Sequence, residues 1–551
     1  MNANEMIKAS PKLLSPFFDG TVTSELSADY ILPDTYPDVK KILRVRARPI
    51  SIGRFISGRR LEYSGAVDYI VVFCAEASES GEDSTPRPDT LHAVHFAAEY
   101  TGALDSEYDL DGCEITISPR IQSCNARLQN PRKLSIKASV ANDVKLSHMI
   151  PCAPKIEGAP TLEDEMKLER LTTVRPTLLE KVFTADHEQL SENLEPDASQ
   201  PAIDEIVTCD AELHFHEVKP QRSSDGFTVM LKGEALIDCI YKAQSEAGDY
   251  RSFARKLPLS YVVGADDYSE FFKDAKPETL CASAIGTLTE LNAAVGENSY
   301  GERRVLELDM SFDIDVRLCA DVDVPLTLDV YSIDRDTECV TRRLELSSLG
   351  KLIPANFSVN ESISREELNL PGDADWNVVD IQADAVIGSA TPISGRAQLT
   401  GEASVSCIFS DRNGGFASAD FRLPVRCELS VGEISEPIAF MCECKTSDLR
   451  ARLDSNRLYC DFEVSLGAAF IKRARIDAVE TVRIAKEPRP TSDDASSLVL
   501  CYPSGGETLW QIAKRYSTTT GAIEALNPSL SDPPHVILIP VGRGAAVSKI
   551  I

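Results

Sequence analysis

Long apolar runs are missing from this 551-residue chain. No window approaches the run of about 18 uninterrupted apolar residues that a membrane-spanning helix requires. The N-terminal stretch from Met1 to Phe18 has polar residues and two prolines scattered through it, so it offers no apolar segment like the core of a secretory signal peptide. These absences predict a protein that is not inserted in a membrane and that stays in the cytoplasm, where it is made.

Basic residues are also too few to balance the acidic ones. The chain has 57 lysines and arginines against 86 aspartates and glutamates, a formal net charge of −29 at pH 7. A surface this acidic repels phosphate backbones and anionic lipid, which argues against nucleic-acid binding. It also weakens attraction to an anionic wall polymer. A basic protein partner would suit the charge, although solubility alone explains it as well.

Motifs that carry catalysis are absent too. The sequence has no Gly-x-Ser-x-Gly elbow, no phosphate-binding loop ending in Gly-Lys-Ser/Thr and no His-Glu-x-x-His. Two histidine pairs and one acidic strand are the candidate metal ligands: His92 and His95, His214 and His216, and Asp309, Asp313 and Asp315. No third ligand accompanies either histidine pair, and no glycine turn shapes the acidic strand into a calcium loop. We therefore expect no metal, no cofactor and no enzymatic activity.

Cysteine is present but shows no Cys-x-x-Cys spacing. The 15 cysteines are odd in number and scattered, and several lie in apolar, strand-like runs, among them Cys74, Cys239, Cys407 and Cys460. This pattern is typical of reduced, buried thiols in a cytosolic protein. The close pair Cys442 and Cys444 could bind metal or cross-link, but two strand residues so near in sequence favour a structural role.

A repeated segment runs through the chain. The runs 61–73, 229–241 and 397–409 share a glycine followed eight residues later by an aromatic residue. The glycines are Gly65, Gly233 and Gly401, and both separations are 168 residues. Self-similarity at a fixed period indicates tandem copies of one structural unit. We predict three copies, covering residues 1–165, 166–345 and 346–486.

The local pattern within each copy is that of β-strands. Residues 306–316 alternate apolar with polar side chains, as do 228–240 and 398–409. The repeated glycines interrupt such strands, which suggests a bulge or sharp bend at one place in each copy. The fold class is therefore mainly β, with three tandem antiparallel, sandwich-like domains. Residues 487–496 are polar and contain prolines, which is typical of a flexible linker.

The pattern changes after this linker. A short strand at 498–502 precedes a turn, and Thr508 with Gln511 forms the pattern of a helix capping box. An apolar helix face follows, made of Leu509, Ile512, Ala513 and Tyr516. Thr519 can cap a second helix that stops at 527–528, and residues 536–540 form a last strand. The expected order is βααβ.

This module, at residues 497–543, resembles the LysM family. The run 506–516 is similar to the first-helix signature of that family, and 526–528 and 537–540 match the second helix end and the final strand. The resemblance implies a small α+β domain that binds N-acetylglucosamine polymers between two loops. The candidate partner- or glycan-binding residues are Gly505, Gly506, Glu507, Thr508, Leu509, Trp510, Asn527, Pro528, Ser529 and Leu530.

Two departures bear on glycan binding, and one residue stands apart. Glu507 occupies a position where the family usually has aspartate, and residues 533–535 replace the usual Pro-Gly turn. A stiffer second loop need not present the same backbone groups. Trp510 lies off the apolar face of its helix, so we expect it to be exposed, where an aromatic side chain can anchor a partner.

Tandem β units followed by one LysM module resemble the spore-coat-associated SPOCS family, closest to the SipL type of clostridial sporulation protein. The segments 31–43 and 125–134 and the strand around Gly65 are similar to recurrent patterns of that family. The resemblance implies a non-catalytic coat scaffold in the mother-cell cytoplasm, at the forespore surface, with its LysM docked on the coat morphogenetic ATPase SpoIVA. The alternative is a peptidoglycan- or N-acetylglucosamine-binding wall or cortex protein, which would need export. A third possibility is a structural subunit that self-associates through strand edges.

Overall fold

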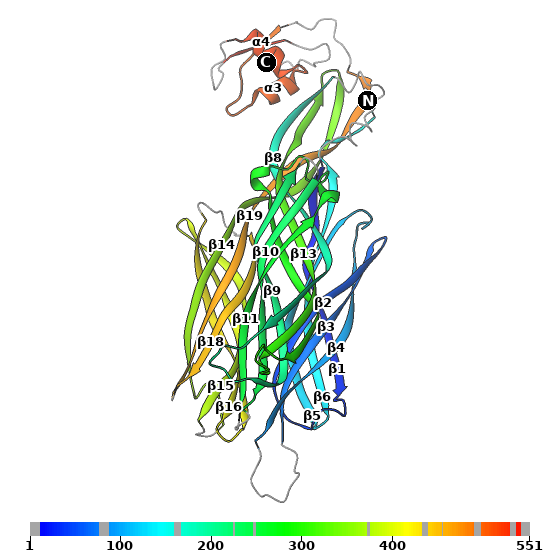
Figure 1. Ribbon diagram of the computed structural model, residues 1–551. Helices are drawn as coiled ribbons and strands as arrows, with labels where there is room; N and C mark the ends of the chain where they lie inside the picture. Colours follow the sequence, from blue (N-terminus) through cyan, green and yellow to red (C-terminus); the bar gives the residue numbers. More distant parts are fainter. Residues whose placement is uncertain are drawn as a thin grey trace, which may run out of the picture.

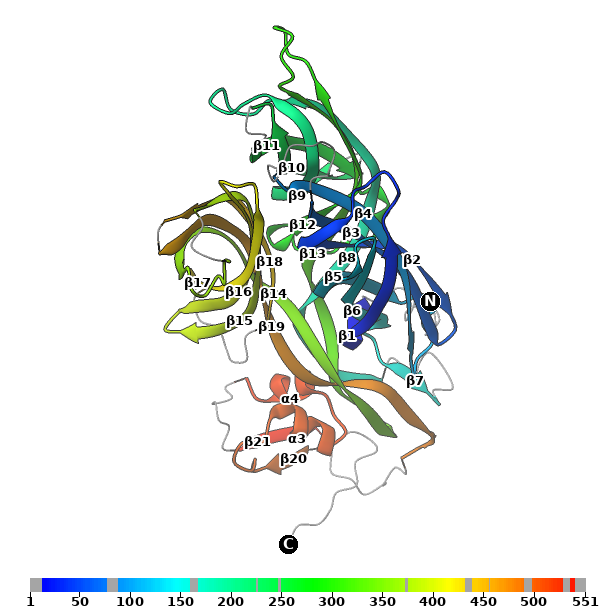
Figure 2. The ribbon, with the colours of Figure 1, turned by 90° about the horizontal axis from the view of Figure 1, so that it is seen from below.

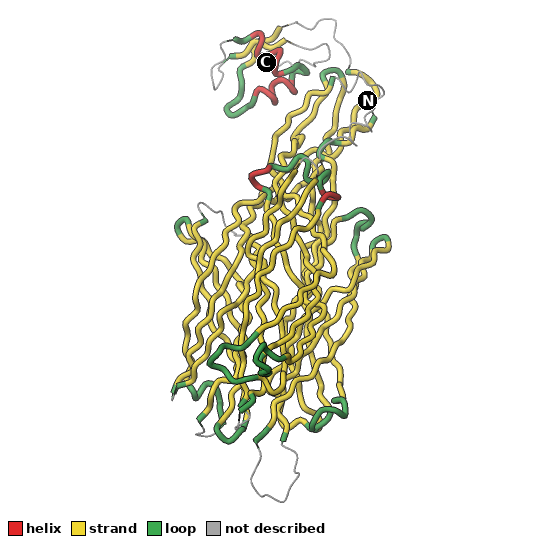
Figure 3. Tube along the Cα trace, in the orientation of Figure 1, coloured by secondary structure: helices red, strands yellow, loops and turns green. Residues whose placement is uncertain are grey.

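The computed structural model describes residues 12–76, 88–158, 167–223, 226–245, 249–371, 375–431, 439–454, 456–489, 498–528 and 536–540. Strands account for 77% and helices for 4%, which confirms the predicted mainly β class. Long strands form an elongated body, and a small helical module lies beyond one end of it (Figure 1). Figure 3 shows the same division, with α-helix confined to that module and short 3₁₀ turns (η1, Asp266–Tyr268; η2, Pro277–Thr279) in the body.

The first unit is a sandwich of two three-stranded antiparallel sheets. One sheet has the order β1 (Lys12–Ile31), β6 (Lys133–Pro151), β5 (Glu114–Asn130). The other has the order β2 (Val39–Ser57), β3 (Arg60–Ala75), β4 (Thr90–Asp105). Alternate side chains of both sheets point inward and are buried, among them Leu61, Tyr69, Phe73, Leu134 and Ile136. Period-two alternation thus places one face of each strand in the core.

The second group of strands follows the same order but forms one continuous sheet. Its strands are β8 (Leu168–Leu194), β9 (Ile203–Ser223), β10 (Gly226–Ala243), β11 (Tyr250–Gly264), β12 (Cys281–Gly296) and β13 (Val305–Ser332). The sheet order is β11-β10-β9-β12-β13-β8, so the two halves are joined where β9 meets β12 at the pair His214–Ile285.

The third group again forms two sheets. Its strands are β14 (Arg335–Ser364), β15 (Trp376–Ile393), β16 (Arg396–Asp411), β17 (Phe416–Ser430), β18 (Ala439–Leu453) and β19 (Arg457–Pro488). The orders β14-β19-β18 and β15-β16-β17 match those of the first unit. The expected boundary at 345/346 falls inside β14, and the one at 165/166 touches residues outside the described ranges. Viewed from below, the three groups lie side by side (Figure 2).

Each repeated glycine faces a β-bulge. Gly65, Gly233 and Gly401 lie in the central strands β3, β10 and β16. The register of the preceding strand shifts opposite each of them, which leaves one extra residue there: Ile52, His216 and Gly388. A Cβ atom on Gly233 would lie 2.1 Å from the His214 carbonyl oxygen, and one on Gly401 would lie 2.0 Å from that of Val386. A Cβ atom on Gly65 would instead meet the Tyr100 ring, at 2.5 Å. The predicted bulge in each copy is confirmed, and Gly233 and Gly401 are needed because the bulged backbone approaches them so closely.

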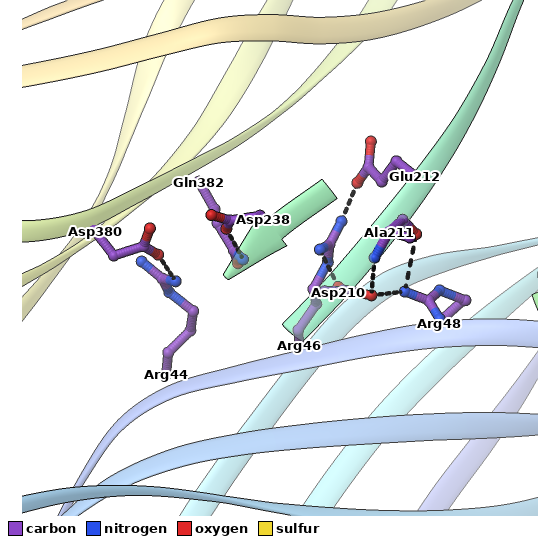
Figure 4. Close-up of polar contacts among 9 residues, drawn as sticks. All are labelled: Arg44, Arg46, Arg48, Asp210, Ala211, Glu212, Asp238, Asp380 and Gln382. Carbon is purple, nitrogen blue, oxygen red and sulfur yellow. Dashed lines mark hydrogen bonds and ion pairs between the residues drawn. The ribbon is translucent and has the colours of Figure 1, made fainter. Parts of the chain in front are cut away.

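Three arginines on one face of β2 connect the three groups of strands (Figure 4). Arg44 is buried and forms an ion pair with Asp380 of β15, and it also donates hydrogen bonds to Oγ and O of Ser406, at 3.1 and 3.0 Å. Arg46 pairs with Asp210 and Glu212 of β9, and Arg48 also pairs with Asp210. Period-two spacing puts all three arginines on the same side of the strand. We call this set the arginine ladder.

An acidic side chain lies beside the arginine ladder. Asp238 of β10 accepts a hydrogen bond from Gln382 Nε2 at 3.2 Å (Figure 4). Burial and the nearby Asp380 carboxylate raise the pKa of Asp238 to about 8. Its carboxyl group is therefore mainly protonated at neutral pH in the folded protein, whereas it is ionised in the unfolded chain.

This difference predicts a pH dependence of stability. Because the folded protein binds the Asp238 proton more tightly than the unfolded chain, stability falls as pH rises from about 4 to about 8 and then levels off. Asp238→Asn should remove this component, so the urea midpoint of the variant should exceed that of the wild type at about pH 8.5 by more than it does at about pH 5.5. An equal difference at both pH values would contradict the assignment.

Paired strand ends extend the body toward the C-terminal module. The β8–β13 pairing continues to Leu168 and Ser332, and the β14–β19 pairing begins at Arg335 and Pro488. Short β7 (Lys155–Glu157) joins β19 in parallel. Val330, Val479, Val482 and Ile484 form a small buried cluster between these pairs. We call these paired ends the extension; it reaches the base of the helical module (Figure 1).

Candidate functional site

The C-terminal module has the expected βααβ order. Its elements are β20 (Leu498–Cys501), α3 (Leu509–Arg515), α4 (Thr520–Leu526) and β21 (Ile537–Pro540), and β20 pairs antiparallel with β21. The buried core contains Cys501, Ile512, Ala513, Ile523, Ile537 and Ile539. The predicted apolar face is confirmed, because Ile512 and Ala513 are fully buried while Leu509 and Tyr516 pack at the edge of the core.

Both helix starts are fixed by threonine caps. Thr508 Oγ1 accepts a hydrogen bond from Gln511 N at 3.3 Å, and Gln511 Oε1 accepts one from Thr508 N at 2.9 Å. This reciprocal pair is the predicted capping box. Thr519 Oγ1 likewise accepts a hydrogen bond from Ala522 N at 3.0 Å. The caps fix the direction in which the chain enters each helix, and thereby position the loop ahead of α3.

The first candidate loop is exposed and is supported from within by Glu507. Ser504, Gly505, Gly506 and Thr508 are exposed to solvent. The Glu507 carboxylate accepts a hydrogen bond from Ser504 N at 3.2 Å and pairs with Arg515 at 3.0 Å. Burial lowers the pKa of Arg515, but Glu507, Cys501 and Tyr516 together outweigh it, so the net pKa is raised. Glu507 therefore holds the loop in shape, and the exposed surface is mostly backbone.

In the second candidate loop, Asn527 has a structural role. Its Nδ2 donates to the carbonyl oxygens of Ile523 and Leu538 at 2.6 and 2.7 Å, and its Oδ1 accepts from Leu538 N at 2.9 Å. The amide thus ties the end of α4 to β21, and both of its N–H groups are used in doing so. Pro528 is exposed. Ser529 and Leu530 lie outside the described residues.

Trp510 is held within the molecule. Its Nε1 donates a hydrogen bond to Asp329 Oδ2 of β13 at 2.8 Å, and its ring lies edge-on to Tyr331, with 4.9 Å between ring centroids. Lys514, one helical turn later, contacts both Asp329 carboxylate oxygens at 2.7 and 2.8 Å. The expectation that Trp510 is exposed is therefore wrong: the side chain is half-buried, since the end of the extension covers part of it.

Tyr331 completes this contact. It is 1% exposed, packs in the same core cluster as Ile512 and Ile523, and donates a hydrogen bond from its hydroxyl to Thr518 O at 2.6 Å. Arg489, at the end of the extension, bonds Ser517 and pairs with Asp336 at 2.8 Å. We call this contact the seat, comprising Asp329 and Tyr331 on the extension and Trp510, Lys514 and Thr518 on the module. A single sequence gives no signal for it, because Asp329 and Trp510 are 181 positions apart.

Removing the Asp329 carboxylate should loosen the seat. A hydrogen bond to a charged group contributes about 1.5–3 kcal/mol, so Asp329→Ala should raise the undocked fraction by roughly tenfold or more. The chain has 2 tryptophans, so in a Trp376→Phe background the emission of Trp510 should shift to longer wavelength as the ring becomes hydrated. Asp309→Ala, an exposed change on the same strand, is the control. Unchanged Trp510 emission in the Asp329 variant would argue against the seat.

A second exposed surface lies on the outer face of the β20–β21 pair. Leu498, Leu500 and Tyr502 alternate with inward-facing residues and are 48%, 62% and 73% exposed. Val536, just before β21, is 47% exposed. Clustered exposed apolar side chains are typical of sites that bind other macromolecules. We call these four residues the apolar strip.

The candidate metal ligands are not gathered into a site. Within the described ranges, no group of three or more histidine, cysteine, aspartate or glutamate side chains is arranged to hold a metal ion. The bulge in β9 separates His214 from His216, and their ring centroids are 6.3 Å apart. Asp315 accepts a hydrogen bond from Thr184 at 2.5 Å. Among the residues that the structure describes, no helix is long and apolar enough to cross a membrane.

Comparison with known proteins identifies only the C-terminal module. No curated protein and no solved structure matches the chain. Residues 505–542 match the LysM domain family, within the range 497–543 expected from the sequence. The match begins at the exposed first loop, includes both helices and extends past β21. LysM domains are modules that bind carbohydrate, peptidoglycan in particular. The C-terminal module of this chain is therefore a LysM domain.

Proposed function

We propose that this chain is a non-catalytic binding scaffold, in which a rigid β body carries a LysM domain at one end. The observation that carries the proposal is the LysM match at residues 505–542, on a module seated against the extension. The seat joins the domain to the paired strand ends through Asp329 and Tyr331. A binding domain held in this way presents its loops at a fixed orientation to the body.

The ligand class that best fits the LysM domain is an N-acetylglucosamine polymer such as peptidoglycan. Exposed backbone groups between Ser504 and Thr508 suit the acetamido groups of such a glycan, because amide N–H and C=O groups can pair with them. The seat occupies Trp510, Lys514 and Thr518, and it leaves this loop exposed. Glycan binding therefore does not require the domain to leave its seat.

A protein partner is the second candidate, and the apolar strip favours it. Leu500 and Tyr502 are large, exposed apolar side chains of the kind found at the centres of protein interfaces. The net charge of −29 suits a basic protein better than an anionic wall polymer. Combined with the resemblance to SPOCS proteins, this candidate is a spore-coat scaffold in the mother-cell cytoplasm that docks on a SpoIVA-like ATPase at the forespore surface.

Calorimetry on the full chain separates the two candidates. The chain would be titrated with N-acetylglucosamine oligomers, with peptidoglycan fragments and with a purified SpoIVA-like ATPase. Gly505→Gln places a side chain in the first loop, where a Cβ atom meets nothing within 4 Å, and should weaken glycan binding by about tenfold or more. Gly521→Gln is the matched control, because Gly521 is exposed on α4 and equally uncrowded.

Substitutions in the apolar strip test whether a protein partner binds there. Leu500→Ser and Tyr502→Ser should weaken binding to the ATPase by about tenfold or more and leave glycan affinity unchanged. Heat from the glycans alone would make this a wall- or cortex-binding protein and remove the coat-scaffold candidate. Heat from the ATPase alone would support the coat-scaffold candidate and remove the wall- or cortex-binding one. Binding to none of the three ligands would overturn both candidates.

A further inference from the structure

Several thiols lie beside one another in the body, although their sequence spacing shows no motif. All 15 cysteines are free thiols. Within the described strands, three pairs of thiols on different strands are in hydrogen-bonding contact: Cys209 with Cys239, Cys281 with Cys319, and Cys407 with Cys460. A fourth pair, Cys442 and Cys444, lies within β18, with 3.7 Å between the sulfur atoms. The first two pairs lie directly opposite each other on neighbouring strands. The third pair links β16 of one sheet to β19 of the facing sheet.

The geometry of directly opposed residues suits a disulfide. In antiparallel sheets, opposed Cα atoms lie about 4.5–5.5 Å apart, and disulfides span Cα separations of about 4.4–6.8 Å. Cys281 is the first residue of β12, where the strand leaves the η2 turn, and its register partner on β13 is Cys319. A bond between these two sulfur atoms therefore needs a change of side-chain rotamers and little movement of the backbone.

Among the three pairs that join different strands, access singles out Cys281 and Cys319. Cys281 is partly exposed, while Cys239, Cys407 and Cys460 are at most 1% exposed. The hydrogen bond from Cys319 lowers the pKa of Cys281, although burial opposes the effect. In contrast, the hydrogen bond with Cys281 and then burial raise the pKa of Cys319. The attacking species in thiol chemistry is the thiolate, so Cys281 is the thiol of this pair that reacts first.

We propose that Cys281 and Cys319 are a reversible dithiol–disulfide site that reacts with small-molecule disulfides. The Cys281 thiolate attacks one sulfur of the small disulfide, which forms a mixed disulfide and releases one small thiolate. Cys319 then loses its proton and attacks the Cys281 sulfur, and the second small thiolate leaves. Two protein thiols are thereby oxidised by two electrons, the small disulfide is reduced to two thiols, and the two protons move to the leaving groups. The resulting disulfide links β12 covalently to β13.

Peptide mapping after oxidation tests the proposal. The full chain would be incubated with oxidised glutathione, its remaining thiols blocked with N-ethylmaleimide, and its peptides analysed by mass spectrometry without reduction. The peptide that links Cys281 to Cys319 should accumulate at least about tenfold faster than peptides that link the two more deeply buried pairs. Dithiothreitol should return it to two thiols.

Single substitutions separate the roles of the two thiols. Cys319→Ser should leave Cys281 as a stable mixed disulfide with glutathione, whereas Cys281→Ser should leave Cys319 unreacted because it is 5% exposed. Cys124→Ser is the control, because Cys124 is partly exposed but burial raises its pKa to about 11. If one serine variant fails to fold, the reaction of the other with glutathione still tests the proposal. A linked peptide that forms only in urea, or a Cys281 that reacts no faster than Cys124, would overturn the proposal.

Discussion

Asp380→Ala should lower the free energy of unfolding by about 3–5 kcal/mol, because it leaves the Arg44 guanidinium buried without its counter-charge. The side chains of Arg44 and Asp380 are 4% and 3% exposed, so water cannot replace the lost partner. Ser406 still accepts two hydrogen bonds from Arg44, but a hydroxyl and a carbonyl do not neutralise its charge. Urea denaturation followed by circular dichroism measures the loss. Asp420→Ala, an exposed carboxylate on β17, should change the midpoint little.

A double substitution tests whether the loss comes from the unpaired charge. Arg44→Met with Asp380→Leu replaces the ion pair by two apolar side chains, and it should restore most of the stability lost in Asp380→Ala. The site suits this replacement, since Leu43, Ile240, Val379 and Ile408 form a buried apolar cluster beside it. If the double variant is as unstable as Asp380→Ala, the ion pair acts in some way other than by compensating a buried charge.

Gly401→Ala should cost about 3 kcal/mol of stability, the upper end of the usual range for an overpacked site. The added Cβ would lie 2.0 Å from the Val386 carbonyl oxygen and 2.8 Å from Ile387 Cα. Both atoms belong to the backbone of β15, which is fixed by its ladder with β16, so neither can rotate away as a side chain could. Gly233→Ala should behave in the same way, because its Cβ would lie 2.1 Å from His214 O.

The same bulge supplies the matched control. Gly388 is the extra residue of the bulge that faces Gly401, and a Cβ there meets nothing within 4 Å. Gly388→Ala should therefore be tolerated, with a urea midpoint close to that of the wild type. If both alanine variants lose the same stability, the loss comes from the bulge conformation, and the close approach to Gly401 is not its cause.

The features that could be predicted from the sequence are those encoded over short distances. Alternation of apolar residues gives the strands. The period of 168 residues marks the same bulge in each copy, because a Cβ atom on the glycine there would meet backbone in two copies and the Tyr100 ring in the first. The capping box of Thr508 and Gln511 and the buried face of α3 are also local, since each depends on residues within two helical turns.

The features that could not be predicted depend on partners far apart in sequence. Arg44 and Asp380 are 336 positions apart, and Trp510 and Asp329 are 181 apart. Nothing in the local pattern of either residue shows which strand end will face it after folding. Trp510 was expected to be exposed because it lies off the apolar face of its own helix, but helical periodicity describes one element and not the surface packed against it. The thiol pairs were missed for the same reason.

The seat also raises the concentration that a ligand needs in order to bind Trp510 and Lys514 of the LysM domain. Asp329 is part of the same chain, so it competes for Trp510 and Lys514 as a tethered group at an effective concentration in the millimolar range. A ligand that needs those two side chains binds with an affinity reduced in proportion to the undocked fraction. A ligand of the exposed 504–508 loop meets no such competitor. At low ligand concentration the β body thereby keeps Trp510 and Lys514 occupied and leaves the 504–508 loop available.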